Sequence, residues 1–293
     1  MRTLEYLSDP VLRSIYLPGI GVGALAALAC GIVSPAVVVK RLGFVGQGIS
    51  HSAFGGIGVA SLLAAWGLIE TGGRAEFAVV VAFCAAAAWG MGVVGGAAAG
   101  RRSGSEDTAI GVFLVASMAL GAILVQVARE HALASGRAGD VRSWESILFG
   151  SVSVTGMEEV RLCAAVAGLV ALSAWAFRRP GLFWAADEEA ARAFGVPTRA
   201  VRAGLMLALA LVVVTTMKVA GVVLSTALLV LPGATALRVS DRLATVWGLS
   251  VAVGLAGIGA GFVVSFETGW QPGPSIVAAL VAMYAAALAV GKR

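Results

Sequence analysis

The sequence predicts an all-α membrane protein, a polytopic helical bundle of eight or nine transmembrane helices. Only 13% of the 293 residues are charged, against about 25% in soluble domains, so little of the surface faces water. Hydrophobic residues make up 59% of the chain and fall in long runs. Crossing about 30 Å of hydrocarbon takes roughly 20 helical residues, so the helices leave no room for a separate soluble domain.

The apolar runs define the helices in chain order. The sixth and seventh runs are predicted either as two helices or as one broken helix, so the count is eight or nine. A loop over residues 129–156 is the longest, and a second over 179–201 precedes the sixth helix. The predicted helices cover residues 14–38, 45–69, 76–99, 108–128, 157–178, 202–218, 221–237, 243–266 and 275–291.

Basic residues predict the orientation of the helices. If the turn at Lys40 and Arg41 is cytoplasmic, thirteen of the 21 Lys and Arg residues fall on that side and eight on the other. Because cytoplasmic loops carry an excess of basic residues, this assignment is favoured. It places the N-terminus outside and makes residues 129–156 an extracytoplasmic loop.

A short helix is predicted on the cytoplasmic side, outside the membrane, from Asp187 to Gly195. Asp187 can cap its first turn, and Glu188 and Glu189 suit the positive end of the helix dipole. Gly195, followed by Pro197, ends the helix. The residues alone leave two interpretations open: an ordinary connector between spans, or a docking element for a cytoplasmic partner.

His51 is the ionisable side chain that stands out within the predicted spans. Nine residues from a helix start near residue 42 place it about 13 Å along the axis, close to the bilayer midplane. Gln47 lies four residues earlier and projects from the same face. Imidazole is a common Zn²⁺ ligand and suits Mn²⁺ less well, while an amide carbonyl binds weakly. Such a pair suits a site that releases its ion, but His51 is equally interpreted as a hydrogen-bond donor to a neighbouring helix.

Pro232 and Gly233 lie in the middle of the seventh predicted helix. Proline removes a backbone hydrogen bond, which frees a carbonyl that must face protein or a wet pathway. The pair therefore predicts a kink, which is interpreted either as structural or as lining a pathway.

Several function classes are disfavoured by what the sequence lacks. There is no GxxxxGK[ST] phosphate-binding motif, so we predict a chain that is not an enzyme and that depends on another chain for any energy from ATP. The predicted helix interiors contain no Asp or Glu, which disfavours a secondary, ion-coupled carrier. A single His without a second nearby ligand is too little for an intramembrane catalytic site. No cofactor and no nucleic-acid partner are expected.

Six motifs in one order carry a resemblance that covers nearly the whole chain. Together they resemble the zinc/manganese/iron permease family of bacterial ABC importers. The motifs are Lys40-Arg41 with Gly46-Gln-Gly-Ile-Ser-His51, Glu106-Asp-Thr-Ala-Ile-Gly111, Leu148-Phe-Gly-Ser151, Asp187-Glu-Glu-Ala-Ala-Arg-Ala-Phe-Gly195, Leu228-Leu-Val-Leu-Pro-Gly-Ala-Thr-Ala236 and Pro272-Gly-Pro-Ser-Ile-Val277.

The resemblance implies a single transmembrane permease domain over residues 1–293, in the bacterial inner membrane and surrounded by lipid. It further implies a homodimer that works with a cytoplasmic ATPase subunit and an extracytoplasmic metal-binding protein. The cytoplasmic helix then looks like the coupling helix of the family. The residues implied to dock on the ATPase are Asp187, Glu188, Glu189, Arg192 and Gly195.

The resemblance also implies that His51, together with Gln47, contacts the transported ion. Many members of the family have Gly-Asp where this chain has Gly46-Gln47, so a hard anionic ligand is missing here. We therefore expect Zn²⁺ as cargo first, Mn²⁺ second and iron third. An ABC importer of a metal chelate or vitamin shares a glycine-rich helical bundle but generally has a longer chain with more spans.

Overall fold

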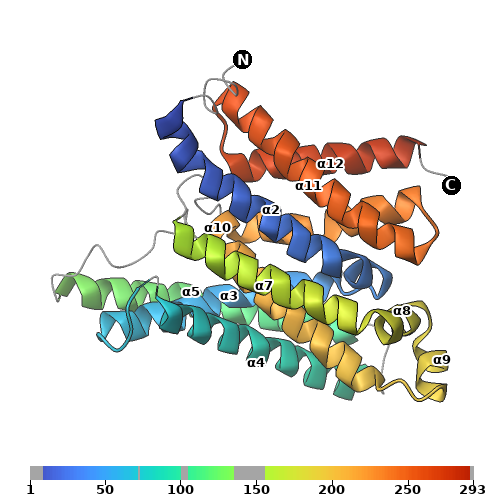
Figure 1. Cartoon of the computed structure of the whole chain (residues 1–293). Helices are drawn as coiled ribbons and strands as arrows, with labels where there is room; N and C mark the ends of the chain where they lie inside the picture. Colours follow the sequence, from blue (N-terminus) through green and yellow to red (C-terminus); the bar gives the residue numbers. More distant parts are fainter. Residues whose placement is uncertain (1–8, 72, 100–104, 135–155, 291–293) are drawn as a thin grey trace. The chain divides into compact units, whose positions relative to one another are not determined.

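Every regular element in the described part of the chain is a helix. The computed structural model describes residues 9–71, 73–99, 105–134 and 156–290. Nine of its helical segments are long and apolar enough to cross a membrane, which confirms the predicted fold class. The helices are α2 (Pro10–Val39), α3 (Gly43–Ala65), α4 (Arg74–Ala99), α5 (Ser105–Ala134), α7 (Met157–Ala176), α8 (Arg178–Ala186), α9 (Glu188–Ala193), α10 (Thr198–Val239), α11 (Leu243–Thr268) and α12 (Pro272–Val290) (Figure 1).

Two local predictions need correction. The loop does not begin at residue 129, because α5 continues to Ala134. In this polar extension the side-chain amide of Gln126 donates to Glu130 at 3.2 Å, one turn later. The rest of the predicted loop, residues 135–155, lies outside the described residues. The second correction is α8, a helix that was predicted as part of a loop.

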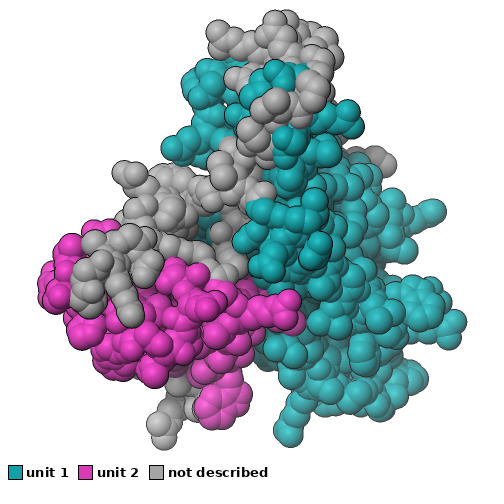
Figure 2. Space-filling view, turned by 60° about the vertical axis from the view of Figure 1, so that its left-hand side comes forward, with its two compact units in different colours: residues 1–43, 148–208, 215–293 teal, residues 44–147, 209–214 magenta. Residues whose placement is uncertain are grey.

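The described chain forms two compact units, coloured separately in Figure 2. Unit 1 comprises residues 1–43, 148–208 and 215–293, and unit 2 comprises residues 44–147 and 209–214. Within unit 1, α2 packs against α7 and α11, and α11 also packs against α12. Within unit 2, α4 packs along α5. That the whole chain acts as one permease domain stays a prediction.

Glycine lets helix backbones meet closely in both units. In unit 2 a Cβ on Gly58 would lie 2.9 Å from the Cα of Gly121, where α3 crosses α5. In unit 1 a Cβ on Gly31 would lie 2.9 Å from the Cα of Val251, where α2 crosses α11. Side chains larger than hydrogen do not fit at these distances, so small residues determine where these helices pack.

The chain bends back within α10 at Gly221. In a straight helix nine residues span about 13.5 Å, yet the hydroxyls of Thr216 and Ser225 lie 2.7 Å apart. Gly221 has φ 76° and ψ 171°, a conformation open essentially to glycine. The sixth and seventh predicted helices are therefore two spans, Thr198–Met217 and Ala220–Val239.

An ion pair in unit 1 supports the predicted topology. Lys40 follows α2, Glu188 opens α9, and their side chains lie 3.5 Å apart. Among the described residues, four of the nine spans lie between Lys40 and Glu188, and an even number of crossings returns the chain to the same side. This end of unit 1 also carries Arg178, Arg179 and Arg192, in line with the excess of basic residues expected on the cytoplasmic side, and the orientation itself stays a prediction.

Candidate functional site

His51 lies within the span formed by α3. It follows the first residue of the helix, Gly43, by eight residues, which places it about 12 Å along the axis. The side chain is half-buried, and its ring lies nearly parallel to that of Phe54, with centroids 6.1 Å apart and an interplanar angle of 12°. Its Nδ1 atom is buried and has no hydrogen-bond partner among the described residues. The interhelical hydrogen bond considered from the sequence is therefore not seen at Nδ1.

Gln47 lies one turn before His51 and is exposed. Phe44, a further turn toward the start of α3, is 57% exposed, so one face of this half of the helix is open in the isolated chain. The described residues contain no group of three or more His, Cys, Asp or Glu side chains that could hold a metal ion. An ion at this face of α3 would meet a sparse and neutral donor set, which suits transient contact better than tight storage.

The predicted cytoplasmic helix is present as α9, and it begins and ends with the capping residues that the sequence predicts. The Asp187 carboxylate accepts a hydrogen bond from the Ala190 amide at 2.9 Å, which caps the first turn. Gly195 has φ 81°, and the Val196 amide donates to the carbonyl of Ala191 at 2.9 Å. This left-handed glycine ends the helix before Pro197, as the sequence predicts.

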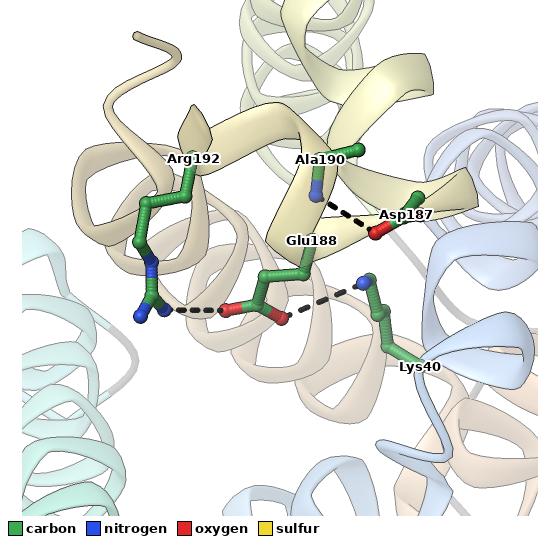
Figure 3. A network of polar contacts seen from close by, with 5 residues as sticks. All are labelled: Lys40, Asp187, Glu188, Ala190 and Arg192. Carbon is green, nitrogen blue, oxygen red and sulfur yellow. Dashed lines mark hydrogen bonds and ion pairs between the residues drawn. The ribbon is translucent and has the colours of Figure 1, made fainter. Parts of the chain in front are cut away.

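Glu188 is held between two cations, as Figure 3 shows. One carboxylate oxygen lies 3.5 Å from the Lys40 ammonium, and the other lies 3.7 Å from the guanidinium of Arg192, one turn later in α9. The side chains of Lys40 and Glu188 are 16% and 33% exposed, whereas that of Arg192 is 70% exposed. Glu188 is thus engaged within its own chain, an interaction that the sequence did not predict.

The other residues predicted to dock a partner lie on the surface. Asp187, Glu189, Arg192 and Gly195 are all exposed. Phe194 was not predicted as a site residue, but it is 81% exposed beside them. A large apolar side chain within an otherwise charged and small segment was the sequence signal that could have indicated it.

Pro232 and Gly233 are buried where α10 meets α2. The Gly233 amide donates to the Ser34 hydroxyl at 2.8 Å, and this hydroxyl lies 3.4 Å from the carbonyl of Val230. Ser34 therefore compensates for the helical hydrogen bonding disturbed by proline. This contact gives the motif a structural role, and a role in lining a pathway stays a prediction.

Comparison with known proteins decides the family. Residues 14–291 match the ABC 3 transport family. The chain belongs to this family. Members of this ABC 3 family are permease subunits without an ATPase site of their own. The nine apolar helices among the described residues, together with relatives that are membrane proteins of bacterial transport systems, identify this ABC 3 protein as a multi-pass protein of the bacterial inner membrane.

Two relatives extend the match over nearly the whole ABC 3 chain. One, from Thermotoga maritima, is named "Probable metal transport system membrane protein" and is 31% identical over 275 residues, covering 94% of this chain and 89% of the relative. The other, from Halalkalibacterium halodurans, is the "Manganese transport system membrane protein MntC". It is 28% identical over 288 residues, covering 98% of this chain and 91% of the relative.

A solved structure shares the fold of this ABC 3 chain. It is PsaBC from Streptococcus pneumoniae in complex with Fab, with a TM-score of 0.79 and 24% sequence identity. The similarity covers 98% of this chain and 95% of the matched chain. The helical arrangement of this chain is therefore that of the matched chain.

Proposed function

We propose that this ABC 3 chain is the permease subunit of an ATP-driven importer for a divalent transition-metal ion. Family membership supplies the transport class, and the names of the two relatives support a metal as cargo. The observation in the chain itself that carries the proposal is His51, a half-buried imidazole within a span whose Nδ1 has no partner among the described residues. The metal is cargo, and no resident cofactor is proposed.

The choice of metal rests on two arguments that point in different directions. The donors at the open face of α3 are an imidazole and an amide, which favour Zn²⁺ over Mn²⁺. The Halalkalibacterium halodurans relative is named for manganese, which supports Mn²⁺. We propose these two ions as cargo, ahead of iron.

The proposed assembly has three kinds of protein component. Two copies of this chain form the pathway in the lipid bilayer, and a metal-binding protein delivers the ion from the extracytoplasmic side. On the cytoplasmic side, α9 docks on an ATPase subunit through Asp187, Glu189, Arg192 and Gly195, with Glu188 behind them. Phe194 supports this assignment, because it is 81% exposed and aromatic residues are enriched at protein interfaces.

The proposed mechanism is alternating access. ATP binding and hydrolysis on the partner move α9, and the ion passes His51 as the pathway opens to one side and then to the other. A neutral, sparse donor set lets the ion leave after it has been bound, whereas a complete tetrahedral set would retain it.

Reconstituted vesicles test the proposal. Vesicles containing the chain with its ATPase and metal-binding protein should take up Zn²⁺ or Mn²⁺ only when ATP is present. His51→Ala should abolish uptake without loss of the ATPase subunit from the purified complex. His131→Ala, the same change at an exposed position on α5, should transport normally. Unchanged uptake by His51→Ala would remove the metal-contacting role.

Two alternatives give different results in the same assay. A secondary carrier would take up metal in a proton gradient with no ATPase present; it is disfavoured because the buried carboxylate among the described residues, Glu76, lies in the first turn of α4. An importer of a metal chelate would transport the chelate in preference to the free ion, so a competition between the two separates it from the proposed function.

A further inference from the structure

The end of α2 is joined to α9 by a charged contact that is shielded from water. The Lys40 ammonium lies 3.5 Å from the Glu188 carboxylate, and its side chain is only 16% exposed. The residues are 148 positions apart in the sequence. A pair that is partly withdrawn from solvent interacts more strongly than a surface pair, because water screens it less.

Lys40 also contacts α8. Its ammonium lies 4.4 Å from the ring centroid of Trp184, in position for a cation–π interaction. Trp184 is 3% exposed and belongs to an apolar cluster that joins α8, α9 and the first turns of α10 and α11. The cluster consists of Trp184, Ala185 and Ala191, with Phe183, Val196, Val201, Leu205 and Trp247 packed against it.

The turn that follows Lys40 is short and closed by a backbone hydrogen bond. Arg41 takes the left-handed conformation, with φ 55°, and the Leu42 amide donates to the carbonyl of Val37 at 2.7 Å. Leu42 is buried at 8% exposure, and α3 begins at the next residue. A short, hydrogen-bonded turn has little conformational freedom, so a displacement of Lys40 is passed along the chain to α3, the helix that carries His51.

We infer that Lys40 is a positioning residue that couples the movement of α9 to α3. This inference rests on the proposed function. In it, the ATPase displaces α9, Glu188 and Trp184 transmit the displacement to Lys40, and the turn passes it to the start of α3. Loss of the Lys40 contacts should leave ATP hydrolysis running while less metal is moved for each ATP hydrolysed.

The experiment measures metal uptake and phosphate release in the same vesicles, which contain this chain, its ATPase and its metal-binding protein. Lys40→Met keeps the length and apolar stem of the side chain and removes its charge. Lys40→Arg keeps the charge and can still face both Glu188 and the Trp184 ring. The matched control is Arg199→Met, which removes a charge from an exposed position in the first turn of α10.

For Lys40→Met we expect uptake per ATP to fall about ten-fold, as the loss of a charge-assisted contact predicts. Phosphate release should stay within about two-fold of the rate of the natural chain, a change that corresponds to well under 1 kcal/mol. The ATPase subunit should still co-purify with the variant. Lys40→Arg should retain most of the natural ratio, and Arg199→Met should leave it unchanged. An unaltered ratio in Lys40→Met would overturn the inference. So would a loss of both rates in equal proportion, which indicates a purely structural role.

The inference and the proposed function fail in distinguishable ways. If vesicles with the natural chain hydrolyse ATP but take up neither Zn²⁺ nor Mn²⁺, the proposed function is wrong. If they take up metal and the ratio of Lys40→Met equals that of the natural chain, only the role of Lys40 is wrong.

Discussion

Replacement of Gly233 by alanine should destabilise unit 1. Gly233 lies where α10 crosses α2, and a Cβ there would lie 2.6 Å from the Ser34 hydroxyl oxygen, 2.7 Å from the Ser34 carbonyl carbon and 2.8 Å from the nitrogen of Pro35. Non-bonded heavy atoms pack at about 3.5–4.0 Å. Two of the three atoms belong to the main chain, so a rotated side chain does not relieve the contact.

The magnitude follows from two terms. Overpacking of a close helix crossing costs about 1–3 kcal/mol. Separation of the helices also weakens the hydrogen bond from the Gly233 amide to Ser34, which is 2.8 Å long, and such a bond contributes about 1 kcal/mol. Together the two terms lower the free energy of unfolding by about 2–4 kcal/mol relative to a glycine-to-alanine variant whose added methyl group makes no close contact.

Gly259→Ala is that reference. It lies within α11, and a Cβ there has nothing within 4 Å, so it shares the gain of about 0.5–1 kcal/mol from replacing glycine within a helix. The free energy of unfolding is measured for both variants by reversible SDS denaturation in mixed micelles. Gly233→Ala should unfold at lower SDS than the natural chain, and Gly259→Ala at equal or higher SDS.

Two results would refute the argument. One is a Gly233→Ala stability within about 0.5 kcal/mol of Gly259→Ala, the range of an ordinary surface change. The other is full recovery when Ser34→Ala is added, since the carbonyl carbon of Ser34 and the nitrogen of Pro35 would still be too close. If Gly233→Ala is stable but fails to transport, the predicted role of Pro232 and Gly233 in lining a pathway gains support instead.

Three further predictions concern local contacts. Arg41→Gly should raise the unfolding free energy by up to about 1 kcal/mol, because it relieves a left-handed non-glycine residue, whereas Arg41→Ala should not. Asp187→Ala should destabilise α9 by about 1 kcal/mol and speed hydrogen exchange of the Ala190 amide about five-fold. Asp187→Asn should restore the protection of that amide, because its side-chain oxygen can accept the same hydrogen bond. Thr216→Val should lower the free energy of unfolding by about 1–3 kcal/mol, because the buried Ser225 hydroxyl loses its hydrogen bond to Thr216. Adding Ser225→Ala should recover most of that loss, as measured by SDS unfolding.

Local features of this chain were predictable from its sequence. The spans follow from apolar length alone, because a helix satisfies its own backbone within the bilayer. Asp187 and Gly195 mark the ends of α9 because a cap and a left-handed stop involve only residues a few positions away. His51 stood out because a charged or titratable group inside a span is rare.

The candidate site shows where such prediction ends. Five residues around Asp187 were predicted to dock a partner, but the sequence did not show that Glu188 faces Lys40, and it did not single out Phe194 or Trp184. The helical period places residues on a face of α9 but does not say what that face meets. The number of spans was likewise left open until the contact between Thr216 and Ser225 showed the chain bending back at Gly221.

By itself, the sequence determined a helical membrane protein, the capped helix α9 and a histidine within the span formed by α3, and it predicted a basic cytoplasmic end. Only the tertiary structure decided that Lys40 meets Glu188 across 148 positions and that Ser34 meets Gly233 across 199. The physical reason is the range of the forces. Helix formation and capping depend on neighbours within about one turn of the chain, whereas interhelical contacts depend on how whole surfaces pack, and many pairings satisfy the same apolar composition.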